Sequence, residues 1–208
     1  MKISKGWWSV IVILTVLIID QTVKIWVKTH MYLGENIRIA DWFYIYFVEN
    51  NGMAFGMELG SKLLLTLFRI AVVIAAIYYM YRIKDREDVK TGFMVCLSLI
   101  VAGAAGNIFD SLFYGVIFNN PAPPAIATMF PADGGYAAPL YGKVVDMLYF
   151  PLFSFYWPQW MPWVGGQYFL FFQPIFNVAD AAITVGMLVF ILFYSGFLSK
   201  TPTADMPQ

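Results

Sequence analysis

Four long apolar stretches dominate the pattern of hydrophobic and polar positions along this 208-residue chain. A helix needs about 20 mostly apolar residues to cross a bilayer. The pattern therefore predicts four spanning helices, at about 7–27, 62–81, 92–118 and 174–198. The first follows Lys2 and Lys5, as a signal peptide would. Because it lacks a small-x-small cleavage pattern and polar residues continue it, we interpret it as a retained helix.

Basic residues predict the orientation of these helices, because Lys and Arg concentrate on the cytoplasmic side of a membrane. Lys2 and Lys5 precede the first helix, and Lys200 follows the last. The short segment between the second and third helices contains Arg82, Lys84, Arg86 and Lys90. We therefore expect both termini to be cytoplasmic. The loops at about 28–61 and 119–173 are then extracytoplasmic.

The two outer loops differ in composition. Asp41–Asn50 (DWFYIYFVEN) is rich in aromatic and β-branched residues, which favours strand. Residues 119–142 are rich in Pro, Ala and Gly and predict irregular structure. Residues 149–173 carry three Trp among many Phe and Tyr, which is typical of an aromatic belt at a membrane–water interface. A lid over a lipid-bearing substrate is the alternative interpretation of this aromatic loop.

Composition supports a membrane protein. Hydrophobic residues make up 60% of the chain and charged residues 12%, with a mean hydropathy of +0.67. A soluble domain is roughly half apolar and a quarter charged. We therefore predict an all-α integral membrane protein with a single domain over residues 1–208. The formal net charge is zero, so nucleic acid is not an expected partner.

Polar residues inside the predicted helices are the clearest functional signal, because charge within a bilayer is costly. Two Asn-x-x-Asp pairs occur, Asn107–Asp110 and Asn177–Asp180. Residues three apart share a helix face, so each pair presents an amide and a carboxyl together. For Asn107–Asp110 alone, a hydrogen-bonded contact between helices is an equal alternative to a functional role.

The depth of the polar residues suggests that the four helices share one outer polar layer. With a rise of about 1.5 Å per residue, Asp180 lies roughly 9 Å from the outer end of its helix. Arg69 and Asp20 each lie roughly 10 Å from the outer ends of theirs. Asp20 and Lys24 are four residues apart, and we interpret them as an internal ion pair rather than as catalytic groups. Arg69 is interpreted as neutralising a nearby carboxylate.

Two further polar motifs lie just outside the helices. Asn50 and Gly52 occur in VENNGMAFGM, where Gly52 permits a turn that other residues resist. Asp146 occurs in GKVVDMLYF, flanked by apolar residues, and is expected at an apolar boundary. Cys96 and His30 are the only cysteine and histidine, so neither a disulfide nor a His-rich metal site is expected.

Taken in order, these motifs resemble those of the type II (lipoprotein) signal peptidases. The resemblance covers about residues 7–198. The matching residues are Asp20-Gln-x-x-Lys24, Asn50-x-Gly52-x-Ala54-Phe55, Gly106-Asn107-x-x-Asp110, Val144-Val145-Asp146 and Phe176-Asn177-x-Ala179-Asp180.

The resemblance implies a bacterial inner-membrane aspartic endopeptidase that needs no metal or cofactor. Such enzymes remove the signal peptide of diacylglyceryl-modified prolipoproteins, on the N-terminal side of the lipidated cysteine. It further implies a small extracytoplasmic β-sheet after the first helix and an active site near that face. By resemblance Asp146 and Asp180 are catalytic, and the supporting residues are Asn50, Gly52, Asn107, Asp110, Asn177, Asp20 and Lys24. The expected partners are prolipoprotein and membrane lipid, with the enzyme acting as a monomer.

The chain departs from the family pattern in two places. Family members usually carry Arg directly after the Asp of the GNxxD motif, where this chain has Ser111. A Pro/Ala-rich insertion also separates Asp110 from Asp146. We hypothesise that Arg69 takes the role of the missing arginine.

Other functional classes fit the sequence less well. A small ion-coupled carrier that uses intramembrane Asp residues is the main alternative. Carriers usually bind at the midplane and show repeated halves, which this chain lacks. A non-enzymatic lipid-binding or assembly protein would explain the aromatic loop but not the carboxyl and amide groups. A presenilin-type protease would need a Gly-x-Gly-Asp motif, which is absent from the sequence.

Overall fold

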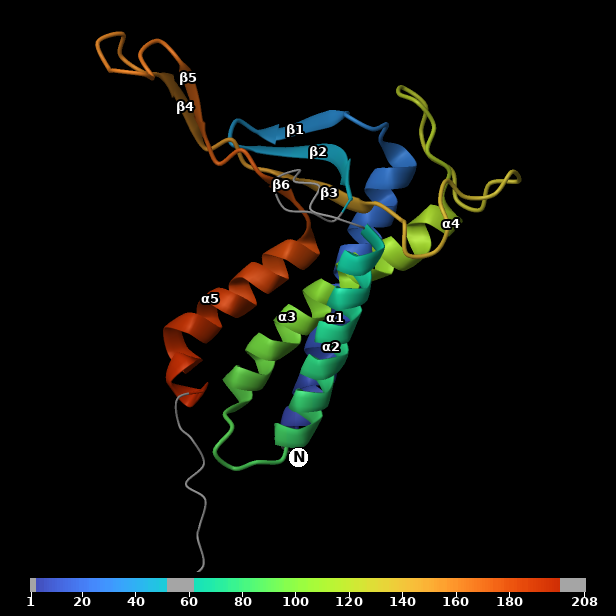
Figure 1. The fold of residues 1–208 in the computed structure, drawn as a ribbon, viewed down its shortest axis with the longest axis vertical. Coiled ribbons are helices and arrows are strands. Elements are labelled where there is room, and N and C mark those ends of the chain that lie inside the picture. The colour runs from blue at the N-terminus through green and yellow to red at the C-terminus, as the bar shows by residue number, and fades with distance from the viewer. Residues whose placement is uncertain (1–2, 52–61, 199–208) are drawn as a thin grey trace, which may run out of the picture.

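The computed structural model describes residues 3–51 and 62–198 of the chain (Figure 1). Within these residues, four helices are long and apolar enough to cross a membrane. They are α1 (Lys5–His30), α2 (Lys62–Ile83), α3 (Thr91–Phe109) and α5 (Val178–Leu198). The third span continues from α3 through a π-helical turn, η2 (Asp110–Tyr114), into the short helix α4 (Gly115–Ile117). The four predicted helices are thus confirmed.

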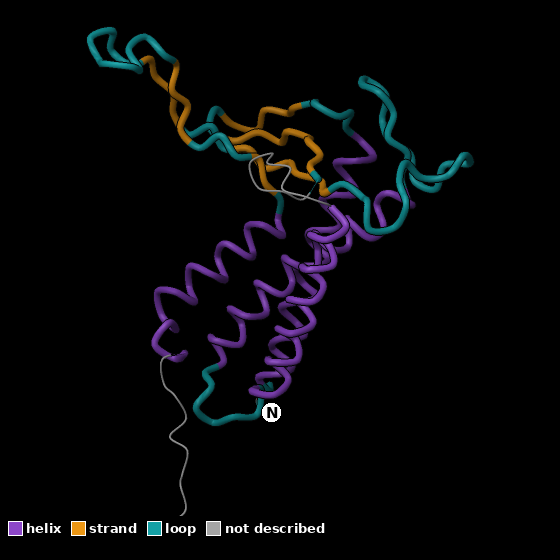
Figure 2. The backbone as a smooth tube through the Cα atoms, viewed as in Figure 1, coloured by secondary structure: helices purple, strands orange, loops and turns teal. Residues whose placement is uncertain are grey.

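A four-stranded antiparallel sheet lies at one end of the helices, in the order β1-β2-β3-β6 (Figures 1 and 2). Its first two strands, β1 (Asn36–Ala40) and β2 (Phe43–Asn50), follow α1 as expected. The other two, β3 (Val144–Tyr149) and β6 (Ile175–Phe176), come from the second loop. The sheet is therefore built from both predicted outer loops, and Asp146 lies in a strand rather than in a loop.

The predicted start of the last helix at residue 174 is wrong. Ile175 and Phe176 pair with Tyr149 and Leu148 of β3, so their backbone groups belong to the sheet. The helix begins only at Val178. The apolar run alone could not separate the two states, because a short apolar segment fits either a strand or a helix.

The aromatic loop contains a separate two-stranded hairpin of β4 (Phe153–Tyr156) and β5 (Tyr168–Phe171). These strands pair only with each other. Figure 1 shows the hairpin projecting beyond the end of the four-stranded sheet, on the α5 side of the molecule. Residues 119–142 contain no named strand or helix, in agreement with the irregular structure predicted there.

The central helix of the bundle is α3. In the most apolar stretch of the span that runs from α3 to α4, 56% of the residues are buried inside the protein, against 17% in each of the other three spans. Gly103 allows the closest approach, because a Cβ there would lie 2.2 Å from the carbonyl oxygen of Ala179 in α5. A Cβ on Gly106 would lie 2.7 Å from a carboxylate oxygen of Asp20 in α1. Small residues on α3 therefore bring α1 and α5 close together beside Asn107.

Candidate active site

Asp146 and Asp180 come together where the sheet meets the first turn of α5. Asp146 lies in β3 and is 2% exposed, whereas Asp180 is the third residue of α5. Asn177 links them. Its side-chain Nδ2 donates to Asp146 Oδ1 at 2.7 Å, and its backbone N–H donates to Asp180 Oδ2 at 3.4 Å. The two carboxyls predicted to be catalytic therefore share one asparagine.

The Asn177–Asp180 pair forms a capping box rather than one face of a mid-helix segment. The backbone N–H of Asp180 donates to Asn177 Oδ1 at 2.9 Å, and Asp180 accepts from the backbone of Asn177 in return. Such reciprocal bonds satisfy donors that a helix start leaves free. The predicted depth of Asp180, roughly 9 Å inside its helix, is therefore wrong: the carboxyl lies in the first turn.

Asn107 on α3 connects the dyad to the buried charges below it. Its Nδ2 donates to Asp180 Oδ1 at 2.8 Å. Its Oδ1 accepts from Lys24 Nζ at 2.9 Å and from Asn177 Nδ2 at 3.1 Å. A lysine ammonium can only donate, so Lys24 orients the side-chain amide of Asn107 with its oxygen toward the ammonium. The amide N–H groups are thereby turned toward Asp180.

Lys24 binds residues from more than one element, so its ion pair with Asp20 is part of a larger network and not an interaction within α1 alone. Its Nζ lies 3.0 Å from Asp20 and 2.8 Å from Asp110, and all three side chains are fully buried. Asp20 also accepts from the backbone N–H of Ala179 in α5 at 2.9 Å. Asp110 accepts from the backbone N–H of Val145 in β3 at 3.3 Å. This cluster ties α1, the α3–η2 junction, α5 and β3 to one another.

Gln21 and Tyr114 belong to the same network, although no role for either was predicted from the sequence. Gln21 Nε2 donates to Asp110 Oδ1 at 2.9 Å, and Tyr114 donates to Gln21 Oε1 at 3.0 Å. Tyr114 ends the π-helical turn that starts at Asp110. Ser111, at the position where the family usually has arginine, donates to the carbonyl of Asn107 at 3.1 Å. Ser111 is buried and thus holds the turn rather than supplying a charge.

Two of the remaining predicted site residues, Asn50 and Arg69, interact with the dyad. Asn50, on β2, donates through Nδ2 to Asp146 Oδ2. Arg69, half-buried on α2, interacts electrostatically with Asp180. Gly52 lies outside the described residues. Asn50 and Arg69 therefore approach different carboxyls of the pair.

A second buried ion pair, which the sequence interpretation missed, lies behind the site. Lys28 binds Glu49, and the two side chains are only 1% and 2% exposed. The Lys28 ammonium is surrounded by the rings of Phe47, Phe118 and Tyr136, with centroids 5.3–5.8 Å away. Glu49 precedes Asn50 in β2, so their side chains point to opposite faces of the sheet. Lys28 is four residues after Lys24 and so lies on the same face of α1, and this spacing could have predicted that Lys28 is buried too.

Burial gives Asp146 the properties of an acid near neutral pH. Removal from water raises the pKa of Asp146 to about 7, and the negative charge of Asp180 contributes in the same direction. The hydrogen bond from Asn177 opposes the shift. A carboxyl with this pKa can carry a proton beside an ionised carboxylate, which is the arrangement that acid–base catalysis by two carboxyls requires.

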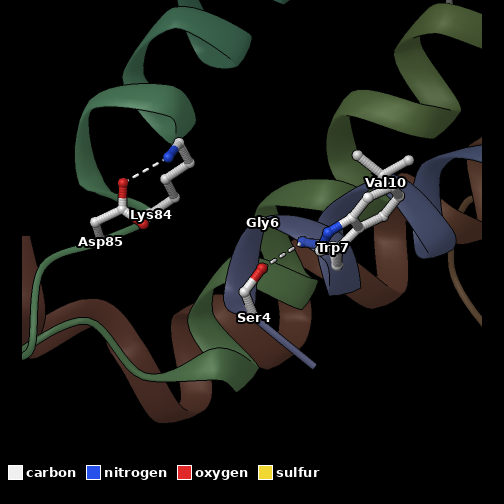
Figure 3. A pocket seen from close by; sticks show the side chains of 6 residues that line it. All are labelled: Ser4, Gly6, Trp7, Val10, Lys84 and Asp85. Atoms are coloured by element: carbon white, nitrogen blue, oxygen red, sulfur yellow. Dashed lines mark hydrogen bonds and ion pairs between the residues drawn. The ribbon is translucent and has the colours of Figure 1, made fainter. Parts of the chain in front are cut away.

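No metal-binding cluster marks this site within the described part of the chain. Residues 3–51 and 62–198 contain no group of three or more His, Cys, Asp or Glu placed to hold a metal ion. A cavity of about 310 Å³ lies near the start of α1 and the end of α2 (Figure 3). Its lining includes Trp7, Val10 and the Lys84–Asp85 pair. Val10 is ten residues from Asp20 along α1, or about 15 Å, so this cavity is separate from the carboxyl site.

Solved structures of similar fold include two bacterial membrane enzymes determined by the in meso method. One, at 2.3 Å resolution, is 23% identical and superposes with a TM-score of 0.61 over 96% of this chain and 93% of that chain. The other, at 1.9 Å resolution, is 25% identical, with a TM-score of 0.59 over 93% and 94% of the two chains. The arrangement of four helices and a small sheet is therefore a membrane-enzyme fold.

Sequence relatives cover nearly the whole chain. The lipoprotein signal peptidase of Porphyromonas gingivalis is 50% identical over 182 residues, which is 88% of this chain and 80% of the relative. That of Amoebophilus asiaticus is 37% identical over 198 residues, covering 91% and 78%. The family model described as signal peptidase (SPase) II matches residues 12–195. The family model and these relatives together show that the chain belongs to the signal peptidase II family of membrane proteases.

Proposed function

We propose that this protein is an aspartic endopeptidase that removes the signal peptide from diacylglyceryl-modified prolipoproteins. The cut lies on the N-terminal side of the lipidated cysteine. Membership of the signal peptidase II family and relatives named lipoprotein signal peptidases support the substrate class. The observation that carries the aspartic mechanism is the binding of both Asp146 and Asp180 by Asn177.

The two carboxyls take different roles because their surroundings differ. Asp180 acts as the ionised base: it lies at the N-terminal end of α5, where the helix dipole favours negative charge. It also accepts hydrogen bonds from Asn107 and Asn177. Asp146 acts as the acid, because burial raises its pKa to about 7 and so favours the neutral form. The apparent pKa values of catalysis belong to the pair, since the two groups interact.

Hydrolysis then follows the general acid–base scheme of a carboxyl pair. The Asp180 carboxylate takes a proton from water, and the water oxygen bonds to the scissile carbonyl carbon. Asp146 gives its proton to the carbonyl oxygen, which yields a neutral tetrahedral diol. Collapse of the diol breaks the C–N bond, with a proton passing from Asp180 to the leaving amine of the lipidated cysteine and one from the diol back to Asp146. Asn50, Asn107 and Asn177 hold the two carboxyls without adding a competing charge.

We place the sheet end of the molecule at the extracytoplasmic face of the bacterial inner membrane and both termini in the cytoplasm. The basic residues Lys5, Lys84 and Arg86 lie at the opposite end of the bundle, as the positive-inside rule requires. Lys5 also connects the start of α1 to the segment between α2 and α3, because its Nζ donates to the backbone carbonyls of Arg86 at 2.5 Å and Val89 at 3.0 Å. We further propose that the protein acts as a monomer.

The test is cleavage of a diacylglyceryl-modified prolipoprotein by the purified protein in lipid nanodiscs. We expect the wild type to release the signal peptide, and Asp146→Asn and Asp180→Asn each to be inactive while still accumulating. Asp133→Asn, which changes an exposed carboxyl in the 119–142 segment, is the matched control and should stay active. Near-normal cleavage by either dyad variant would show that the catalytic assignment is wrong. Equal cleavage of unlipidated prolipoprotein would refute the substrate assignment.

A further inference from the structure

The segment between the two dyad residues carries no charge at all. The 33 residues from 147 to 179 contain no Asp, Glu, Lys, Arg or His, and thirteen of them are Phe, Tyr or Trp. This segment includes the β4–β5 hairpin and the turn at its tip. A projecting hairpin in water normally carries charged residues on its edges, which keep it soluble and unpaired.

Among the described residues, no other strand pairs with the hairpin, and all of β4 and both ends of β5 are exposed. β4 and β5 pair only with each other, and Figure 2 shows them extending away from the four-stranded sheet. Aromatic rings pair across the two strands: Phe153 stacks on Phe171 with centroids 4.7 Å apart, and Phe155 is tilted against Phe169 at 5.1 Å. An isolated two-stranded hairpin is at best marginally stable in water. The hairpin therefore needs an apolar or interfacial surface against it.

The tip of the hairpin exposes the two most accessible tryptophans of the segment. Trp160 is 80% exposed and Trp163 is 96% exposed. Trp combines a large apolar ring with one N–H donor, a combination that favours the boundary between lipid tails and headgroups. A protein partner would instead be expected to meet a polar and charged rim around an apolar centre. No charged rim is available in this segment.

The connection to the bundle places the hairpin beside the lipid. Its second strand leads through β6 directly into α5, a spanning helix whose exposed face includes Leu192 and Phe193 at 71% and 73% exposure. Figure 1 shows the hairpin on the α5 side, reaching sideways past the bundle. We propose that the β4–β5 hairpin is a membrane-lipid-binding element that lies in the bilayer interface, with Trp160 and Trp163 inserted among the headgroups. This proposal does not depend on the catalytic assignment.

Site-directed spin labelling in nanodiscs that contain only phospholipid tests this placement. A nitroxide is attached at Gln159→Cys, an exposed position in the hairpin tip, and in a separate variant at Asp133→Cys, an exposed position in a Gly-rich turn. Both are made in a Cys96→Ala background, which removes the native thiol. We expect the label at 159 to collide more with dissolved oxygen than with a water-soluble nickel chelate. The label at 133 should show the reverse preference.

A second variant connects the insertion to the tryptophans themselves. With the label at 159, Trp160→Glu/Trp163→Glu should move the label toward the aqueous pattern of position 133. The melting temperature should stay unchanged, because side chains this exposed make few contacts within the protein. If the label at 159 is as water-accessible as that at 133 in the parent protein, the lipid proposal is refuted and a protein partner becomes the explanation. If the Glu pair leaves the depth of the label unchanged, the role of the tryptophans is refuted.

Discussion

Replacing the buried acid of the dyad should stabilise the protein while it abolishes activity. Burial raises the pKa of Asp146 from an ordinary value of 3.8 to about 7. The folded state therefore binds more protons than the unfolded state between about pH 4 and pH 7, so the free energy of unfolding falls as the pH rises through this window. One pH unit of difference corresponds to about 1.4 kcal/mol, so ionised Asp146 costs about 4 kcal/mol above pH 7.

The Asp146→Asn variant removes this cost but introduces a smaller one. Asn50 and Asn177 both donate hydrogen bonds to the carboxyl of Asp146, one to each oxygen. An asparagine offers one acceptor oxygen and one donor group, so one of these bonds becomes a contact between two donors. An unsatisfied buried donor costs about 1–3 kcal/mol. The expected gain at pH 8 is therefore about 1–3 kcal/mol.

The pH dependence of this gain identifies its cause. At pH 5 the folded Asp146 is protonated but the unfolded carboxyl is ionised, so only about 1.6 kcal/mol of the cost is present; the lost hydrogen bond offsets it, and Asn should give little or no gain. Thermal unfolding of the detergent-solubilised protein at pH 5 and pH 8 measures the difference, with Asp133→Asn as the exposed control. At pH 8 we expect the melting temperature of Asp146→Asn to rise by several degrees. A variant that melts at or below the wild-type temperature at pH 8, or whose shift is the same at both pH values, would refute the reasoning.

Three other substitutions test separate parts of the structure. Arg69→Met should lower kcat about tenfold, because a loss of about 1.4 kcal/mol of charge interaction with the dyad corresponds to a factor of ten in rate. If kcat and the melting temperature are both unchanged, Arg69 has no role in the site. Lys28→Met should lower the unfolding free energy by up to about 3 kcal/mol, because buried Glu49 loses its closer ion-pair partner and keeps Lys143 at 3.4 Å, and Lys28→Met/Glu49→Leu should recover most of it. Gly103→Leu should lower both melting temperature and activity, because its Cβ meets the backbone of Ala179 at 2.2 Å; wild-type values of both would contradict the close α3–α5 packing.

The sequence predicted the helices well because their signal is local. Twenty apolar residues in a row have few alternatives to a spanning helix, and each of the four is present. The sheet was less predictable, since β3 pairs with β2 across almost a hundred residues, for example Asn50 with Val144. Nothing near Asp146 in the sequence reveals that partner. The segment therefore looked like a loop at an apolar boundary.

The candidate site could be predicted as a set of residues but not as a set of bonds. The family motifs predicted Asp146, Asp180 and their supporting amides as one site. The structure brings together those of these residues that it describes. Gln21 lies within the first motif but had no predicted role, yet its Nε2 donates a hydrogen bond to Asp110 Oδ1 at 2.9 Å. Glu49 was missed because a charged residue within a strand is usually on the face of the sheet that meets water. Its two partners, Lys28 on α1 and Lys143 before β3, are 21 and 94 residues away in the sequence, a separation that no local pattern reports.

The two Asn-x-x-Asp pairs show why identical spacing does not imply identical structure. In Asn177–Asp180 the amide oxygen caps the helix, so the two residues bond each other. In Asn107–Asp110 both side chains bind Lys24, and the amide N–H of Asn107 also donates to Asp180. What separates the two cases is the group that meets the amide oxygen: a backbone N–H at residue 177, and the ammonium of Lys24 at residue 107.

That difference assigns a specific task to the buried lysine. Two carboxylates, Asp20 and Asp110, already surround Lys24, so its charge is balanced without the dyad. Its remaining hydrogen bond goes to the oxygen of Asn107, and this bond decides which end of the amide meets Asp180. An asparagine turned the other way would present an oxygen to a carboxylate, a repulsive contact between two acceptors. Lys24 therefore serves the dyad by orienting a neutral amide, and it does so without placing a positive charge directly against either carboxyl.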